Sequence, residues 1–197
     1  MSLILESAEF ESPIGTITVA VRDGRLCALN FADYQPEQVR WLERRFGAIT
    51  FQPAPDPIGI ITALTAYFGG DLTAFGTIEL DAGGTPFQAR VWSELCKVSA
   101  GRTVSYGELA TRIGSPRAVR AVGAANGRNP ISIVVPCHRV IGSDRRLVGY
   151  GGGLDRKRWL LRHEGALILE TSNLQLPLAN ALTGPEAPHP HWGALAE

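Results

Sequence analysis

Residues 103–117 read Thr-Val-Ser-Tyr-Gly-Glu-Leu-Ala-Thr-Arg-Ile-Gly-Ser-Pro-Arg, and this stretch decides the fold of the second half of the chain. Ser105 and Glu108 have the spacing of a capping box, which predicts a short helix of about two turns. A tight turn follows, and a second helix is expected to start near Pro116 with Ser115 as its cap. Two helices joined by a turn of this length predict a helix-turn-helix.

Upstream of this stretch, Thr85 and Gln88 form another capping box, with proline at the first helical position. The preceding run Asp81-Ala82-Gly83-Gly84 is the best candidate for a domain boundary. The predicted organisation is therefore an N-terminal domain (1–81), a linker (82–85), a mainly helical domain (86–167) and a poorly ordered, proline-containing tail (168–197).

The N-terminal domain has the pattern of a small α/β unit. Residues 16–21 and 26–31 read as two strands joined by an Asp23-Gly24 hairpin turn. Residues 36–46 and 58–68 have helical spacing of apolar residues, and 77–80 could form an edge strand. With the helical second half, the fold class is α+β.

The second helix of the helix-turn-helix has an unusual surface. One of its faces is cationic and nearly free of bulky side chains, and it carries Arg117, Arg120, Ala121, Ala124 and Arg128. Val119, Val122 and Gly123 are expected to face away from it. Small residues allow close approach to another surface, and arginines can meet phosphates or enter between bases. The alternative is a close helix–helix contact with arginines at its rim.

Charge is distributed unevenly although the net charge is zero. Residues 1–85 carry five Arg and eleven acidic residues (−6), residues 86–165 carry fourteen basic and five acidic residues (+9), and residues 166–197 carry three Glu and no basic residue (−3). A basic middle segment beside acidic ones suggests a polyanionic partner. A solvated charged surface explains the same numbers equally well.

Several classes of protein are not indicated. No apolar run approaches the roughly 18 residues of a membrane span, and the N-terminus lacks the basic start of a signal peptide. Cys27, Cys96 and Cys137 are widely spaced and odd in number, which predicts neither a disulfide framework nor a metal site. We expect free thiols, no metal, no cofactor and a cytoplasmic location.

Cys137 lies in the run Pro136-Cys137-His138-Arg139-Val140, which follows the apolar, strand-like residues 131–135. A cysteine becomes a strong nucleophile as the thiolate, so we expect this thiol to be ionised at neutral pH. Because adjacent side chains on an extended chain point apart, a water is expected to link Cys137 to His138.

A third group should orient the imidazole, and Glu164 is the candidate. The helix predicted over 154–163 turns Leu160 and Leu161 toward the core, and Glu164 follows on that side. A carboxylate that is drawn inward needs a partner, and His138 would supply one. The glycine-rich run 149–153 is expected to form a pocket wall.

Taken together, these motifs resemble the O6-alkylguanine-DNA alkyltransferases. The resemblance rests on 103–110, 117–123, Asn129-Pro130, the Pro-Cys-His-Arg-Val motif and Gly149-Tyr150-Gly151-Gly152, and it covers roughly residues 86–165 closely. It implies a ribonuclease-H-like N-terminal domain and a second domain that binds DNA and holds the active site. The partner would be double-stranded DNA containing O6-alkylguanine, entered from the minor groove by a monomer.

The resemblance also implies roles for individual residues. Cys137 would take the alkyl group from a guanine rotated out of the duplex, irreversibly and once per molecule, and O4-alkylthymine would react less well. His138 would remove the thiol proton and Glu164 would orient His138. The other implied site residues are Tyr106 (nucleotide rotation and leaving-group stabilisation), Arg120 (filling of the vacated stack), Asn129 (a link between the DNA-reading helix and the thiol), the pocket residues Val140, Tyr150 and Gly151, and the DNA contacts Ser105, Arg117, Ala121, Ala124, Arg128 and Ser143.

Two departures from the family pattern stand near this site. Ser132 replaces a proline or apolar residue, and Asp144-Arg145-Arg146 replaces a glycine-containing turn. Three other functions remain open: a lesion-binding protein without catalysis, a cysteine hydrolase using Cys137 and His138, and a transcriptional regulator with an inert thiol. Capture of an alkyl group on Cys137 would distinguish the alkyltransferase interpretation from all three.

Overall fold

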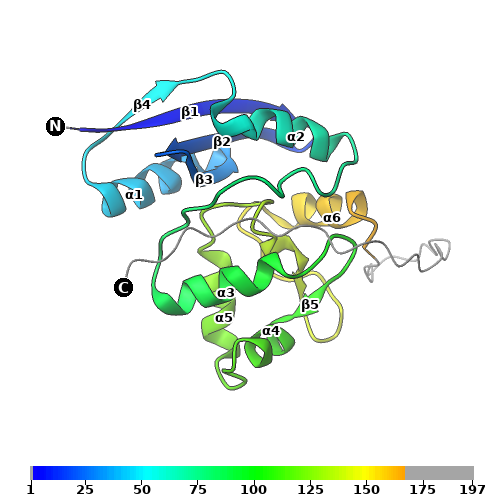
Figure 1. Cartoon of the computed structure of the whole chain (residues 1–197). Helices are drawn as coiled ribbons and strands as arrows, with labels where there is room; N and C mark the ends of the chain where they lie inside the picture. The colour runs from blue at the N-terminus through cyan, green and yellow to red at the C-terminus, as the bar shows by residue number, and fades with distance from the viewer. Residues whose placement is uncertain (1, 167–197) are drawn as a thin grey trace.

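A four-stranded sheet forms the first layer of the computed structural model, which describes residues 2–166 (Figure 1). Its strands are β1 (Leu3–Ser12), β2 (Gly15–Arg22), β3 (Arg25–Phe31) and β4 (Ile49–Pro53), in the order β3-β2-β1-β4. β4 pairs parallel with β1, whereas the other pairs are antiparallel. The predicted β2–β3 hairpin is confirmed, and Asp23 and Gly24 take the positive φ of 49° and 74° that this tight turn requires.

The two faces of the sheet pack against different partners. Alternate residues such as Ala20 and Ala28 meet α1 (Gln35–Phe46), which follows a 3-10 turn at Ala32–Tyr34. Ile17, Val19 and their neighbours on the other face meet α2 (Ile60–Phe68) and much of the second half of the chain. α2 begins two residues later than predicted, after a 3-10 turn at Pro57–Gly59.

The strands of the N-terminal half differ from the prediction at three places. β1 and β4 were not predicted; in β1 the exposed Glu6 lies on one face and the exposed Glu9 and Glu11 lie on the other, which breaks the apolar alternation. The expected strand 77–80 is wrong, since only its last residue, Leu80, makes a ladder contact, as a parallel bridge to Leu26.

The second half contains α3 (Pro86–Cys96), α4 (Tyr106–Arg112), α5 (Val119–Gly127) and α6 (Leu154–His163). Short strands β5 (Val104–Ser105) and β6 (Val140–Ile141) pair in parallel. Both capping boxes form: Thr85 with Gln88 caps α3, and Ser105 with Glu108 caps α4. In Figure 1 these helices lie below the sheet, and α6 lies at the border between the two halves.

The start of α5 differs from the prediction. The helix begins at Val119 rather than near Pro116, and no side chain caps it. Ser115 instead accepts the backbone N–H of Ala118 through its carbonyl, which closes one more turn before the helix. The connection from α4 to α5 is therefore longer than a minimal helix-turn-helix.

The expected strand over 131–135 is also wrong. Apart from a single bridge between Ile131 and Leu29, the run folds into a buried turn in which Val135 N–H donates to the Ile131 carbonyl. Ile133 has a φ of 70°, which is a strained conformation for a β-branched residue. Burial and the flanking hydrogen bonds hold this turn, and they outweigh its β-propensity.

Backbone contacts join this turn to the sheet. Leu29 N–H donates to the Pro130 carbonyl, and Ser132 N–H donates to the Leu29 carbonyl. The two halves of the chain thus share one hydrophobic core beneath the Cys137 segment. None of the helices within residues 2–166 is long and apolar enough to cross a membrane. The predicted tail 168–197 lies outside the described residues.

Candidate active site

Cys137 begins a 3-10 turn, Cys137–Arg139, directly after the buried turn. Its side chain is buried, and Asn129 Nδ2 donates to its Sγ at 3.1 Å. The same Asn129 amide donates to the carbonyls of Ile131 and Val135, and its Oδ1 accepts the Ile131 N–H. Asn129 comes two residues after the last residue of α5, so one side chain fixes the thiol relative to that helix.

His138 follows Cys137 in this turn and is fully buried. Its Nε2 is 2.9 Å from Oε1 of Glu164, the residue that ends α6. Leu160 and Leu161 are wholly buried, as predicted, and they turn Glu164 inward. Nδ1 of His138 has no hydrogen-bond partner among the described residues, so it is the nitrogen available for proton transfer.

Two residues that the sequence analysis missed complete the surroundings of Glu164. Arg139 donates from Nε and Nη2 to the two carboxylate oxygens, each at 2.8 Å. Tyr67, on α2, donates its hydroxyl hydrogen to Oε1 at 2.8 Å. The position of Arg139 beside His138 could have pointed to it, but no local signal links Tyr67 to a carboxylate 97 residues away.

The electrostatics correct one prediction about the thiol. Burial raises the pKa of Cys137, although the Asn129 hydrogen bond and the charge of Lys157 act in the opposite direction. The expectation of a thiolate at neutral pH is therefore wrong for this resting geometry. Burial also lowers the pKa of His138, which leaves its ring neutral and able to accept a proton. Burial alone would raise the pKa of Glu164, but contacts with His138 and Arg139 hold it well below its usual range.

Lys157 is a third residue near the site whose role was not predicted from the sequence. It is fully buried on α6, and its Nζ donates to the carbonyls of Val140, Val148 and Gly149 at 2.5–3.0 Å. Burial lowers its pKa to about 8, and the nearby Cys137 acts in the opposite direction. Lys157 therefore holds the start of the glycine-rich loop and adds positive potential near the thiol.

A cavity of about 130 Å³ opens onto Cys137. Its lining includes the predicted residues Tyr106, Asn129, Tyr150 and Gly151, together with Asn30 and Phe31 from β3, Tyr34, Gly123, Asn126, Gly127, Ser132, Gly149 and Gly152. Val140, which was expected at the pocket wall, does not line this cavity. A cavity this small, against about 300 Å³ or more for most ligand pockets, suits a single planar group.

The glycine-rich loop closes the cavity against the sheet. A Cβ on Gly152 would lie 2.8 Å from the Phe31 ring, so a larger residue there would displace one of the two segments. Ser132 Oγ donates to Asn30 Oδ1 at 2.6 Å and ties the opposite wall to β3. Contacts from the N-terminal half thus shape a cavity whose candidate nucleophile comes from the second half.

Tyr106 connects the cavity to the surface of α5. It is the first residue of α4, and a Cβ on Gly123 would lie 3.8 Å from its ring. Burial and the nearby Cys137 raise the pKa of Tyr106, so its hydroxyl stays protonated and can donate. The Tyr106 ring thus lies against α5 at position 123.

Arg120, Ala121 and Ala124 on α5 are exposed, as predicted; Arg117 and Arg128 are exposed too, but they lie before and after the helix rather than on it. Val122 is buried, as expected, but Val119 is 38% exposed, which contradicts the prediction that it faces inward. The late start of α5 explains this difference, because Val119 belongs to its first, solvent-facing turn. Ser143 lies in the exposed turn 142–146, where Arg145 takes a φ of 63° in place of a glycine.

Comparison with known protein families covers nearly all of the described chain. Residues 86–166 match the DNA-binding domain of 6-O-methylguanine DNA methyltransferase, and residues 7–82 match the ribonuclease-like domain of the same family. These matches agree with the resemblance inferred from the motifs and with the predicted α+β fold.

Individual relatives are similar over most of their length. The methylated-DNA–protein-cysteine methyltransferase of Mycolicibacterium paratuberculosis is 50% identical over 165 residues, 82% of this chain and 93% of that protein. The Salmonella typhimurium protein of the same name is 45% identical over 170 residues, 85% and 99% of the two chains. A crystal structure of Mycobacterium tuberculosis OGT in complex with DNA superposes with a TM-score of 0.70 at 44% identity, covering 83% of this chain and 93% of that one.

Proposed function

This chain belongs to the 6-O-methylguanine DNA methyltransferase family, and on that premise we propose that Cys137 is the residue that accepts the alkyl group. The reaction of the family is repair of alkylated DNA by alkyl transfer to a cysteine of the protein itself. Cys27 and Cys96 are poor candidates, because neither thiol lines the cavity.

The proposed substrate is O6-alkylguanine in double-stranded DNA, with O4-alkylthymine as a poorer one. Sγ of Cys137 attacks the alkyl carbon, a carbon–sulfur bond forms, and the carbon–oxygen bond breaks with its electron pair going to O6. Burial and the nearby Cys137 keep the Tyr106 hydroxyl protonated by raising its pKa, and this hydroxyl donates a hydrogen bond that stabilises the departing base. The thioether product has no hydrolytic exit, so each molecule acts once and stoichiometrically.

Proton removal from Cys137 is assigned to His138. Because burial raises the pKa of the thiol, the proton must leave as the substrate arrives, and the neutral His138 ring accepts it through its free Nδ1 and a bridging water. Glu164 holds the ring through Nε2 and stabilises the imidazolium that forms.

Access to O6 requires the nucleotide to leave the base stack. We assign the exposed face of α5 to the minor groove, where Ala121 and Ala124 permit close approach and Arg120 fills the vacancy. Arg117, Arg128, Ser105 and Ser143 are proposed phosphate or backbone contacts. We propose that the protein acts as a monomer, and the free thiols of residues 2–166 suit the cytoplasm.

The observation that carries this proposal is the position of the Cys137 thiol. It lies inside a cavity sized for a single base, and Asn129 links it to the end of the cationic helix. A hydrolase would need an oxyanion hole and turnover, and a regulator would leave the cavity and the buried His138–Glu164 pair unexplained.

Intact-mass analysis after incubation with an O6-methylguanine duplex tests the proposal. We expect a gain of one methylene on the peptide that contains Cys137, and no gain in Cys137→Ser. Cys96→Ser, which removes another buried thiol, should still react. A protein that binds the duplex but stays unmodified would favour a non-catalytic lesion binder and would overturn the proposal.

A second experiment separates extrusion from chemistry. Arg120→Ala should slow repair of a duplex far more than reaction with free O6-benzylguanine, because only the duplex leaves a vacancy to fill. Equal losses with both substrates would contradict the role of Arg120.

A further inference from the structure

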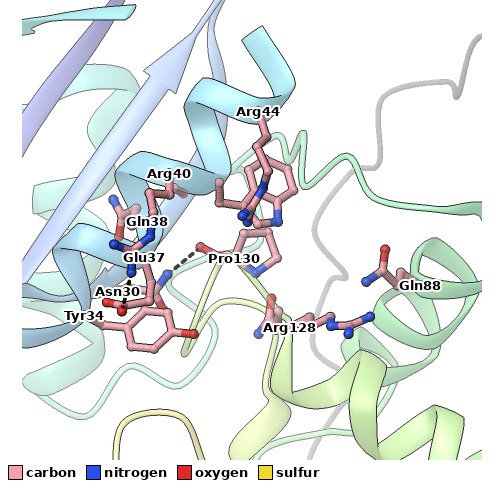
Figure 2. A pocket seen from close by; sticks show the side chains of 12 residues that line it. Asn30, Tyr34, Glu37, Gln38, Arg40, Arg44, Gln88, Arg128 and Pro130 are labelled. Carbon is pink, nitrogen blue, oxygen red and sulfur yellow. Dashed lines mark hydrogen bonds and ion pairs between the residues drawn. The ribbon is translucent and has the colours of Figure 1, made fainter. Parts of the chain in front are cut away.

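A second hollow lies beside the α5 surface (Figure 2), and it adjoins the Cys137 cavity, with which it shares the lining residues Asn30, Tyr34 and Asn129. This α1/α5 cleft has a volume of about 470 Å³ and lies between α1 and the residues that follow α5. α1 contributes Arg40 and Arg44, the C-terminal end of α5 contributes Arg128, and Gln88 lies on the α3 side. It is larger than the Cys137 cavity.

The charges in the α1/α5 cleft do not balance. Arg40 pairs with Glu37 on the same helix, at 2.7 Å. Among residues 2–166, no carboxylate lies within ion-pair distance of Arg44 or Arg128, both of which are exposed. Three guanidinium groups therefore face one hollow with a single acidic partner, and arginine stays charged at any physiological pH. An anion between them would relieve their mutual repulsion.

This excess positive charge comes partly from the acidic half of the chain. Residues 1–85 carry only five arginines against eleven acidic residues, and two of those five line the cleft. Figure 2 shows Arg44 extending from α1 toward Pro130, and Arg128 extending from the segment after α5 toward the side of Gln88. The cationic surface of the second half thus continues onto the N-terminal domain.

We propose that the α1/α5 cleft binds the phosphodiester backbone of the DNA that flanks the lesion. Arginine forks match phosphate oxygens with paired hydrogen bonds. Gln88 and the exposed Tyr34 at the cleft wall add further hydrogen-bonding groups. The N-terminal domain would then contribute directly to DNA affinity, in addition to shaping the Cys137 cavity.

The continuity with α5 favours a DNA strand over a small free anion. At 1.5 Å per residue, Arg128 lies about 12 Å along the helix axis from Arg120. A strand that follows α5 toward its C-terminal end reaches the cleft within about four base pairs, at about 3.4 Å each. This inference rests on the proposed function, since it requires the α5 face to lie on DNA.

Equilibrium binding of the full chain to an unmodified duplex tests the inference, with Arg44→Ala as the variant. Each neutralised phosphate contributes about 0.9 to the slope of log affinity against log salt concentration. Arg44→Ala should therefore reduce that slope by about 0.9, and it should weaken binding about eightfold at 0.1 M salt. Arg44→Glu should weaken binding further.

Arg25→Ala is the matched control. Arg25 lies in the same domain as Arg44, and its replacement by alanine removes the same charge. Arg25 pairs with Glu79 and lines none of the cavities described above. It should retain wild-type affinity and slope, and Arg44→Ala should retain the wild-type rate with free O6-benzylguanine, which shows that the active site is intact. An unchanged slope in Arg44→Ala, or equal changes in both variants, would overturn the inference.

Two further measurements distinguish this inference from the alternatives. If Arg120→Ala weakens duplex binding while Arg44→Ala does not, the α5 face binds DNA and only the cleft assignment fails. If Arg120→Ala is also silent, the proposed binding face itself fails. The last measurement is a calorimetric titration of the protein with inorganic phosphate. Suppose that phosphate binds saturably, that Arg44→Ala abolishes this binding, and that Arg44→Ala leaves the salt slope of DNA affinity unchanged. The cleft would then bind a small anion, and the proposed DNA contact would be overturned.

Discussion

Arg139 holds both carboxylate oxygens of Glu164, with Nε donating to Oε2 and Nη2 donating to Oε1, each at 2.8 Å. The Glu164 side chain is fully buried, so its charge depends on this partner. Glu164 in turn holds His138. The orientation of the proposed base therefore depends on an arginine that belongs to the same short motif as the thiol.

Replacement of this arginine should be strongly destabilising. Arg139→Met leaves the Glu164 carboxylate buried without its bidentate partner, and we expect the free energy of unfolding to fall by about 3–5 kcal/mol. Urea denaturation measures this change. The control is Arg158→Met, which breaks the surface pair with Asp155 and should cost about 1 kcal/mol or less. Similar losses of unfolding free energy in the two variants would show that the buried Arg139–Glu164 pair stabilises the protein no more than a surface pair does.

The pH dependence of the reaction follows from two opposite pKa shifts. Burial keeps the pKa of His138 below 6.5 and that of the Cys137 thiol above 9.0, so neutral base and protonated thiol coexist between these values. The rate with free O6-benzylguanine should be flat from pH 6.5 to about 8, where Lys157 begins to lose its charge, and it should fall at lower pH as His138 becomes protonated. Stopped-flow or quenched-flow measurements at a series of pH values would record this rate.

An unassisted thiolate would behave differently, with a rate that rises about tenfold per pH unit below the thiol pKa. We expect that steep profile in His138→Gln. The same steep rise in the wild-type protein would argue that His138 does not take the proton.

Asn129 should matter for both stability and reactivity. Asn129→Ala leaves the Ile131 N–H and the Val135 carbonyl without their side-chain partner, and we expect a loss of at least about 2 kcal/mol. It also removes the donor that faces Sγ, so reaction with the free base should slow. Asn126→Ala is the comparison, because the Asn126 side chain makes a long hydrogen bond, 3.4 Å, to the Cys137 carbonyl and otherwise interacts with the Tyr106 side chain. A smaller stability loss in Asn129→Ala than in Asn126→Ala would contradict this assignment.

The two capping boxes allow a matched test of how local structure affects the site. Ser105→Ala and Thr85→Ala each remove a cap, and each should lower stability by about 1 kcal/mol. Tyr106 directly follows Ser105, so Ser105→Ala should also slow repair of a duplex. Thermal unfolding and single-turnover kinetics together measure both effects. Slower repair in Thr85→Ala to the same extent would assign the effect to general destabilisation.

Local sequence was sufficient to predict the elements whose signals lie within a few residues. The capping boxes at Thr85 and Ser105, the Asp23-Gly24 hairpin, the span of α6 and the inward turn of Glu164 were all predicted correctly, because caps, turns and helical spacing act over one or two turns of chain. The unpredicted strand β1 shows the limit, since solvent-facing glutamates hide its period.

Tertiary structure decided the features that depend on burial and on distant partners. Tyr67 meets Glu164 from 97 residues away, and Lys157 reaches three carbonyls of a folded loop. Packing against β3 turned residues 131–135 from an expected strand into a tight turn. The pKa of Cys137 rises because the folded protein encloses the thiol, whereas the sequence shows only that an imidazole is adjacent. Residue order thus determined which chemical groups are present, and the fold determined their solvent exposure and hence their protonation.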